Sequence, residues 1–479
     1  MTKLVDSPSI SPTKRAVALD ALRGFAILTM VLSGVIPRKI LPAWMYHAQV
    51  PPPDHIFNPN LPGLTWVDLV FPLFLFSLGA AIPLALSRRL AKGWSTKKII
   101  LSILKRGFLL GAFAIFLQHI RPFTINPNPT TQTWRLALLG FVVLFLMFVR
   151  WPKSWTLRLR NCLTIAAWAV GILLIYKLGD PDGTGFSLEQ SDIILVILTN
   201  VAVFSSIIWL FTRHNWWLRI GLLGLLLALQ LSANADGWLA SVWSVSPAPW
   251  IFRFDYLKYL LIGIPGTIVG DLISSWLQDT QPDDAIEYNW NSKRFIGIIS
   301  LMLLMIIILL IGLQARLLWQ TTLLSIILCL AGFVLLSKPS NLTEKLLVSL
   351  YKWGVYWLIL GLFFEPYQGG IKKDNATISY FFITTGMAIF LLILFIIIVD
   401  VLKKESWLQL LIDNGMNPMI AYVAFANVLW PILILTGWEK TITEMTSTPV
   451  TGFLKGVVYT LIIACFVSLF TRLKLFLRT

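Results

Sequence analysis

Charged side chains are scarce in this 479-residue chain, since Asp, Glu, Lys and Arg together make up 13% of it. A soluble globular domain carries about twice that share. Hydrophobic residues make up 57% of the chain, and its mean hydropathy is +0.77. This composition excludes an ordinary soluble domain and predicts an integral membrane protein.

Cysteine and histidine are also rare. The three cysteines stand far apart, each inside an apolar run, and we interpret them as packing residues: Cys162, Cys329 and Cys465. Neither a disulfide framework nor a metal site is visible in that spacing. The chain has four histidines, and it contains no zincin motif, Gly-rich phosphate loop or nucleophile elbow. We therefore expect no metal cofactor.

Long apolar runs are abundant. A membrane-spanning helix needs about 20 apolar residues, and roughly fourteen runs approach that length, the first at 17–37 and the last at 453–470. The sequence predicts an all-α fold, a polytopic integral membrane bundle of about 11–14 transmembrane helices. We divide it into a cytoplasmic N-terminal tail, an N-terminal transmembrane half, a cytoplasmic linker and a C-terminal transmembrane half, at residues 1–16, 17–277, 278–294 and 295–479.

Basic residues exceed acidic ones, and the formal net charge is +16. They are scattered between apolar runs and not gathered on one polar domain, so nucleic acid is not expected as a partner. Cytoplasmic loops of membrane proteins are enriched in Lys and Arg. The basic segments 88–98 and 150–160 are therefore expected on the cytoplasmic side, together with both termini. Loop 38–63 is then expected on the opposite side.

Charge inside a membrane span is costly and usually faces the bundle interior, and we single out three ionisable residues of the first two predicted spans. Asp20 and Arg23 are three residues apart on one helix face and can pair, although they can also simply mark the membrane interface. Asp68 lies about one turn into the second span. It can orient an imidazole from loop 38–63, or it can be a solvated residue of a helix N-terminus.

Other polar residues are candidates for binding. Arg88, Arg89, Lys105 and Arg106 belong to a dense basic cluster that can hold a phosphorylated cofactor or acidic lipid headgroups. Positive charge on a cytoplasmic loop explains the same cluster. Asn417 stands beside Pro418 at the start of a late span, where its amide needs hydrogen-bond partners.

Two of the four histidines lie close together in the proline-rich stretch WMYHAQVPPPDH (44–55). The imidazole of His47 or His55 can serve as a base near neutral pH, because its ordinary pKa is about 6.5. Each can also be a loop histidine bonded to the backbone. His119 and His214 are weaker candidates.

Several motifs resemble one known family. LDALRGFAILTMVL, WMYHA, GLTWVDLVFPLFLFSLG, IKKDNATISYFF and GMNPMIAYV occur in this order along the chain. Together they resemble the transmembrane acetyltransferase family typified by heparan-α-glucosaminide N-acetyltransferase, and in particular its uncharacterised bacterial relatives. The clear matches cover about a quarter of the chain.

The resemblance implies transfer of an acetyl or acyl group from cytosolic acetyl-CoA, as co-substrate, to a sugar or glycan on the far side of the membrane. It also implies a bacterial plasma (inner) membrane. His47 fits the central catalytic histidine of the family, with His55 as a rival. Asp68 matches the family's aspartate, and Asn417 and Tyr422 match its late motif.

The chain departs from the family at two positions. Ser33 and Gly34 stand where the family enzyme has an asparagine, and Phe425 stands where it has a histidine. The acceptor therefore stays open among amino sugars, cell-wall glycans and lipid-linked saccharides. Two other classes of function also stay open: a transporter or flippase of a glycan or lipid precursor, with GIPGTIVGD (263–271) as a helix interruption, and a scaffold in an envelope assembly.

Overall fold

The structure is a computed structural model that describes residues 15–152, 154–178, 186–233, 237–279 and 288–477. Most of the predicted tail 1–16 and half of the linker 278–294 lie outside these residues. The division into two halves at that linker therefore stays a prediction.

The predicted all-α membrane bundle is confirmed. Among the described residues, thirteen helices are long and apolar enough to cross a membrane. They include α1 (Val17–Val35), α2 (Trp66–Ala91), α3 (Thr96–His119), α5 (Thr131–Phe148), α6 (Leu157–Leu178), α7 (Ile193–Thr212), α10 (Leu260–Asp279), α11 (Ser292–Gln314), α12 (Leu318–Leu335), α13 (Leu342–Phe363), α14 (Ile378–Ile396) and α19 (Pro449–Arg472). The remaining span joins α16 (Pro418–Ala424) to α17 (Trp430–Leu435).

Shorter helices complete the chain: α4 (Pro122–Ile125), α8 (Trp216–Ser232), α9 (Trp238–Trp243), α15 (Gln409–Met416) and α18 (Trp438–Met445). Helix α8 corresponds to one of the fourteen predicted spans, and at 17 residues it is the shortest of them. Every predicted span is thus helical, which is what the bilayer requires of a backbone that has no water to bond.

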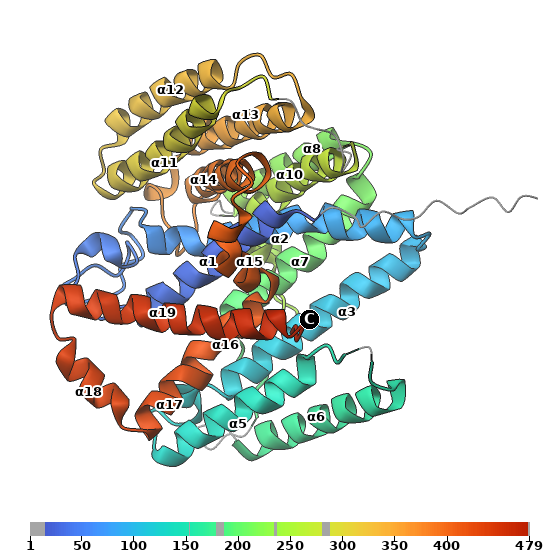
Figure 1. The fold of residues 1–479 in the computed structure, drawn as a ribbon, viewed down its shortest axis with the longest axis vertical. Coiled ribbons are helices and arrows are strands. Elements are labelled where there is room, and N and C mark those ends of the chain that lie inside the picture. The colour runs from blue at the N-terminus through green and yellow to red at the C-terminus, as the bar shows by residue number, and fades with distance from the viewer. Residues whose placement is uncertain (1–14, 153, 179–185, 234–236, 280–287, 478–479) are drawn as a thin grey trace, which may run out of the picture.

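The long helices run roughly parallel between two ends of the molecule (Figure 1). We call the end with loop 36–65 the histidine end, and the end with the α2–α3 connection the arginine end. The chain's described termini meet at the arginine end, where Arg15 and Leu477 line the same cavity. An even number of crossings brings residues 15 and 477 to the same end, and the thirteen long helices together with α8 make fourteen among the described residues.

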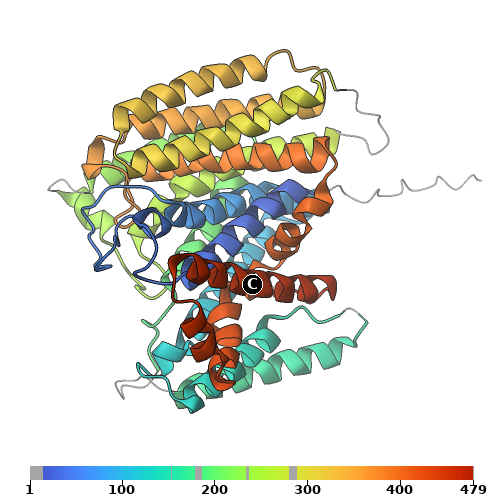
Figure 2. The ribbon, with the colours of Figure 1, turned by 60° about the vertical axis from the view of Figure 1, so that its left-hand side comes forward.

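Helices α11–α13 form one flank of the bundle, and α5 and α6 form the opposite flank, with α1 and α2 between them (Figure 2). Helix α14 lies inside, and all its residues are buried. Helices α6 and α12 lie at the edge and expose many Leu, Ile and Val side chains. Such exposed apolar faces are expected where a helix meets lipid.

Two close helix contacts position the candidate site. Helix α10 runs unbroken through GIPGTIVGD, and a Cβ atom on Gly79 of α2 would lie 2.3 Å from the Gly263 carbonyl oxygen. These glycines therefore allow α2 and α10 to touch, and the predicted helix interruption there is wrong. Similarly, a Cβ atom on Gly415 would lie 1.8 Å from the Asp20 carbonyl oxygen, which brings α15 against α1.

Candidate functional site

At the histidine end, the imidazole ring of His47 lies between the carboxylates of Asp68 and Asp374. Nδ1 of His47 lies 3.1 Å from Oδ1 of Asp68, and Nε2 lies 2.7 Å from Oδ2 of Asp374. The His47 side chain is 17% exposed, so one edge of the ring remains accessible. The predicted proximity of Asp68 to an imidazole is therefore present, with His47 and not His55 as the partner.

Asp68 is rigid because its second oxygen is fully engaged. Thr65 precedes α2 as its N-cap, and Oδ2 of Asp68 accepts hydrogen bonds from the Thr65 backbone N–H and hydroxyl, each at 3.0 Å. The backbone N–H of Ala48 donates to the same oxygen at 3.1 Å. Asp68 is completely buried, and its Oδ1 accepts no hydrogen bond from the described residues. This oxygen lies 3.1 Å from Nδ1 of His47, which itself accepts a hydrogen bond from the Gln49 N–H at 3.1 Å. The cap thus aims one free carboxylate oxygen at the imidazole.

Asp374 was not predicted as a site residue. It lies in the segment 364–377 between α13 and α14, 327 residues from His47 in sequence. Gln49 holds it in place, since the Gln49 side chain accepts from the Asp374 N–H at 2.8 Å and donates to its carbonyl oxygen at 2.7 Å. The only sequence signal was its position in the quoted motif IKKDNATISYFF, and nothing in that motif predicts a contact with loop 36–65.

The charge of Asp374 is stabilised where it lies. Partial burial opposes ionisation, but the hydrogen bond to His47 and the positive charges of Lys373, His47 and Lys258 outweigh it, so the pKa of Asp374 lies below its ordinary value. The Asp374 carboxylate is therefore expected to be ionised near neutral pH.

His55 lies apart from these carboxylates. Its backbone has a positive φ of 53°, its Nε2 accepts a hydrogen bond from the Lys39 N–H at 3.1 Å, and its ring meets Tyr46 edge-on at 4.6 Å. These contacts fold loop 36–65 onto itself. His119, the third histidine, bonds the Ile115 carbonyl oxygen at 2.8 Å and stacks on Phe186.

A cavity of about 480 Å³ opens at the arginine end. Five guanidinium groups line it, from Arg15, Arg23, Arg88, Arg89 and Arg106. Three of the four predicted cofactor-binding residues are thus brought together here. The fourth, Lys105, is exposed and does not line this cavity.

The predicted Asp20–Arg23 pair is present and also lines this cavity, with Oδ1 of Asp20 3.3 Å from Arg23. Arg15 approaches the other Asp20 oxygen to 2.7 Å. Arg23 donates further to the Gly415 carbonyl oxygen at 3.2 Å, across the close α1–α15 contact. Asp20 is the one carboxylate among the described residues that line the cavity, so the site as a whole attracts anions.

Asn417 and Tyr422 occupy different places. The chain breaks from helical geometry at Asn417, whose side chain bonds the Leu475 carbonyl oxygen and the Leu477 N–H at 2.8 and 3.1 Å. Asn417 thus anchors the end of the chain. The Tyr422 hydroxyl donates to Asp192 at 2.9 Å.

A second, small cavity continues from the arginine cavity and reaches Tyr422. The two share Phe74, Leu198, Pro418 and Met419, and together they follow α1 from Leu19 to Met30. Eleven residues of helix span about 16 Å, which is roughly half the hydrocarbon thickness of a bilayer. His47 lines neither cavity.

The two departures from the family motifs have different surroundings. A Cβ atom on Gly34 would meet nothing within 4 Å, so the space for a larger side chain is open. Phe425 instead stacks on Trp430 at 5.6 Å and packs near Tyr459, where it belongs to an aromatic cluster.

Residues 15–273, more than half of the chain, match the family described as "Domain of unknown function (DUF5009)". This range includes His47, Asp68 and all five arginines of the cavity, but not Asp374. The chain is also similar to heparan-alpha-glucosaminide N-acetyltransferase of Mus musculus, with 30% identity over 170 residues. That match covers 32% of this chain and 23% of the mouse enzyme. The chain therefore spans less than a quarter of that relative, and the predicted resemblance is confirmed as a distant relation.

Proposed function

The chain belongs to the family described as a domain of unknown function (DUF5009), and we propose that it is a membrane-bound acyltransferase that uses His47. The acyl donor is an acyl-CoA, acetyl-CoA by the resemblance, held at the cytoplasmic arginine end. The acceptor is a sugar or glycan hydroxyl or amine at the histidine end. The resemblance also implies that the bilayer is a bacterial inner membrane.

The observation that carries this proposal is the imidazole of His47 between two carboxylates. Nε2 of His47 faces Asp374 at 2.7 Å, and Nδ1 accepts a hydrogen bond from the Gln49 N–H at 3.1 Å while lying 3.1 Å from the free oxygen of Asp68. An acceptor that displaces the partly exposed Asp374 carboxylate meets Nε2, which serves as base in the tautomer that carries its proton on Nδ1, facing Asp68. Such a buried carboxylate behind a histidine fixes both the tautomer and the ring orientation.

The transfer step balances without any other reactant. The acceptor nitrogen or oxygen attacks the thioester carbonyl carbon and its proton passes to Nε2 of His47. The carbon–sulfur bond breaks as the new carbon–nitrogen or carbon–oxygen bond forms. The thiolate of coenzyme A leaves and takes up a proton.

The arginine cavity supports the donor assignment. Coenzyme A carries several phosphate charges and cannot cross lipid, and arginine pairs well with phosphate oxygens. The small cavity that reaches Met30 and Tyr422 holds only about 10 Å³, roughly the space of one water molecule. A pantetheine arm that follows α1 from the arginine cavity towards His47 therefore requires side chains along this route to move when the donor binds.

A transporter of a glycan or lipid precursor is the second candidate. The break between α15 and α16 at Asn417 lies beside the intramembrane pair of Asp20 and Arg23, and broken helices beside charged pairs occur in transporter binding sites. A transporter would need no chemical step at His47.

The two functions separate in one experiment. Purified protein is incubated with radiolabelled acetyl-CoA and a panel of amino sugars, cell-wall glycan fragments and lipid-linked saccharides, and label transfer and coenzyme A binding are both measured. The acyltransferase proposal expects transfer to at least one acceptor, and a His47→Ala loss of about 10²–10⁴-fold with binding retained. Absence of both transfer and coenzyme A binding would favour the transporter.

A further inference from the structure

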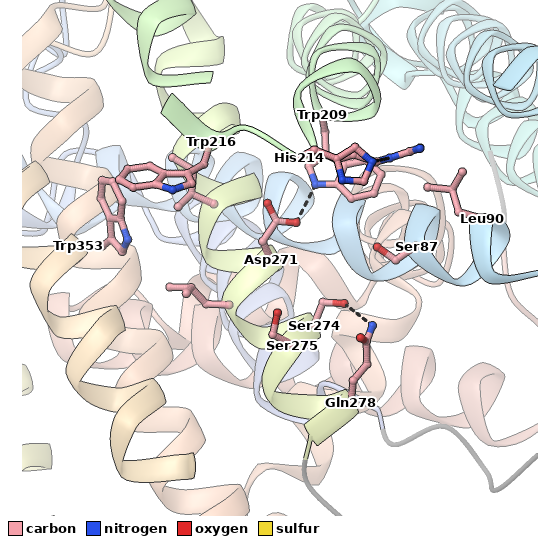
Figure 3. Close-up of a pocket in the computed structure, with 13 residues that line it drawn as sticks. Ser87, Leu90, Trp209, His214, Trp216, Asp271, Ser274, Ser275, Gln278 and Trp353 are labelled. Atoms are coloured by element: carbon pink, nitrogen blue, oxygen red, sulfur yellow. Dashed lines mark hydrogen bonds between the residues drawn. The ribbon is translucent and has the colours of Figure 1, made fainter. Parts of the chain in front are cut away.

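A separate cleft of about 770 Å³, larger than the arginine cavity, also lies at the arginine end (Figure 3). It is formed by α2, α7, α8, α10 and α13, and none of its lining residues belongs to the arginine cavity. Its polar and aromatic lining is contributed by Ser87, Trp209, Arg213, His214, Trp216, Asp271, Ser274, Ser275, Gln278 and Trp353. The proposed acyl transfer makes no use of it.

The floor of the cleft is electrically neutral. Arg219 is completely buried, and its guanidinium lies 2.7 Å from Oδ2 of Asp271. The other Asp271 oxygen accepts a hydrogen bond from the indole N–H of Trp209 at 2.8 Å, which is drawn in Figure 3. Both oxygens of Asp271 are thus engaged, by Arg219 and by Trp209, and the buried guanidinium compensates the charge that would repel an anion in the cleft.

Arg213 supplies the positive charge of the cleft. Its Nε donates to Nε2 of His214 at 2.8 Å. Its terminal nitrogens Nη1 and Nη2 make no hydrogen bond or ion pair with the described residues. Since Nε2 of His214 accepts, a neutral His214 carries its proton on Nδ1 and has a second donor to offer. The cleft therefore presents uncompensated donors to an anion.

The mouth of the cleft lies among side chains suited to the lipid boundary. Trp216 and Trp353 meet edge-to-face at 5.7 Å, and Trp216 stacks on Trp217 at 4.0 Å. Trp217 and Phe211 are 68% and 66% exposed. Tryptophan is enriched where membrane helices pass from hydrocarbon to headgroups. A ligand with one end in lipid and the other in the cleft matches this arrangement.

We propose that the cleft binds one anionic phospholipid of the cytoplasmic leaflet. The phosphodiester accepts from Arg213, and its single negative charge matches the one uncompensated cation among the described residues that line the cleft. Hydroxyl groups of the headgroup bond Ser274, Ser275 and Gln278. The acyl chains pass out over the exposed apolar surface beside Trp216. This inference does not depend on the acyltransferase proposal.

The test counts bound lipid on the full-length protein. Protein is reconstituted in phosphatidylcholine nanodiscs that contain phosphatidylglycerol, extracted in mild detergent, and examined by native mass spectrometry. The expected result is one retained phosphatidylglycerol per chain. Arg213→Gln removes the charge, and Ser275→Phe fills the cleft from an exposed position. Arg213→Gln is expected to lower retention about tenfold, the loss of one charge-assisted hydrogen bond. Ser275→Phe is expected to lower it at least as much, because the ring takes the place of the headgroup.

Arg158→Gln is the matched control, because Arg158 is exposed on α6 and outside the cleft. It is expected to retain the lipid as the unmodified protein does. Equal retention in Arg213→Gln, or equal loss in Arg158→Gln, would overturn the proposal. Loss of the bound phosphatidylglycerol when inorganic phosphate is added would also overturn the proposal, since the cleft would then be a site for a soluble anion.

Discussion

The two polar sites at opposite ends of α1 differ in how far their hydrogen bonds are already satisfied. At the histidine end, Oδ2 of Asp68 accepts three bonds and the Gln49 amide is used at both atoms. At the arginine end, five guanidinium groups surround an open cavity of about 480 Å³ with one carboxylate, Asp20, among its described lining residues. The first arrangement fixes one ring in one orientation, and the second leaves donors for a large anion.

This contrast matches the demands of acyl transfer. A catalytic base must be held in place before substrate arrives, because reorientation during the reaction is costly. A negatively charged acyl donor needs positive charge to attract it and a cavity large enough to hold it. If the contrast is functional, variants at the histidine end will slow acyl transfer with little effect on donor binding. Variants at the arginine end will weaken donor binding with little effect on the transfer step.

Among variants that keep the imidazole of His47, the largest effect is expected from Asp68→Asn. The amide removes the charge that stabilises the imidazolium formed when His47 takes the acceptor's proton, so transfer is expected to fall about 10²-fold, within the range for one acid–base group. Coenzyme A binding should stay unchanged. Transfer rates and a binding isotherm on the same preparation measure both.

Thr65→Ala is the matched control for that variant. It removes the hydroxyl that caps α2 but leaves Asp68 in place, and it is expected to cost about 1 kcal/mol of stability. A transfer loss as large as that of Asp68→Asn would mean that the cap, and not the carboxylate, matters.

A smaller effect is expected at the arginine end. Arg106→Gln should weaken coenzyme A binding about tenfold, since one charge-assisted hydrogen bond contributes about 1.5 kcal/mol. Lys105→Gln changes the neighbouring residue, which does not line the cavity, and should leave binding as it is. Calorimetry on both variants measures the difference. Equal weakening would mean that general positive charge, and not the cavity, attracts the donor.

Asp374 provides a pH-dependent comparison. Its pKa is lowered in the folded protein, so its contribution to stability is present above about pH 4, the ordinary range for Asp, and is lost as the pH falls through the folded value. Asp374→Asn should therefore melt at a lower temperature than the unmodified protein at pH 7. The difference between the two melting temperatures should shrink as the pH falls below about 4. A difference that stays constant from pH 7 to below pH 4 would show that charge is not the cause.

The smallest effect is expected from His55→Ala. The ring bonds Lys39 and packs on Tyr46 within its own loop, so transfer should change less than about twofold, within the noise of one lost neutral hydrogen bond on a surface loop. A loss comparable with that of His47→Ala would reverse the choice between the two histidines.

The sequence predicted the fold well, because hydropathy over 20 residues reports directly on the bilayer. It predicted only some of the residues that form the two sites. Asp68 and Arg106 stand out because charge in a span is rare. Asp374 does not, because it lies in a polar segment, and its contact with His47 depends on how α13 and α14 pack.

Two local readings could not have been settled without coordinates. The motif GIPGTIVGD fits a broken helix as well as a close helix contact, since Gly and Pro serve both. His47 and His55 lie in one proline-rich loop whose course is decided by contacts with segment 364–377, such as the Gly63 N–H bond to Ile371 at 2.9 Å.

In the proposed reaction an acyl group enters at the arginine end and leaves at the histidine end. The most direct measurement uses oriented proteoliposomes with labelled acetyl-CoA sealed on the arginine side and a competent acceptor, found with the sugar panel, on the histidine side. The account predicts labelled acceptor outside the vesicles with unmodified protein and almost none with His47→Ala. Label that appears only when donor and acceptor share one compartment, or that persists in His47→Ala, would contradict it.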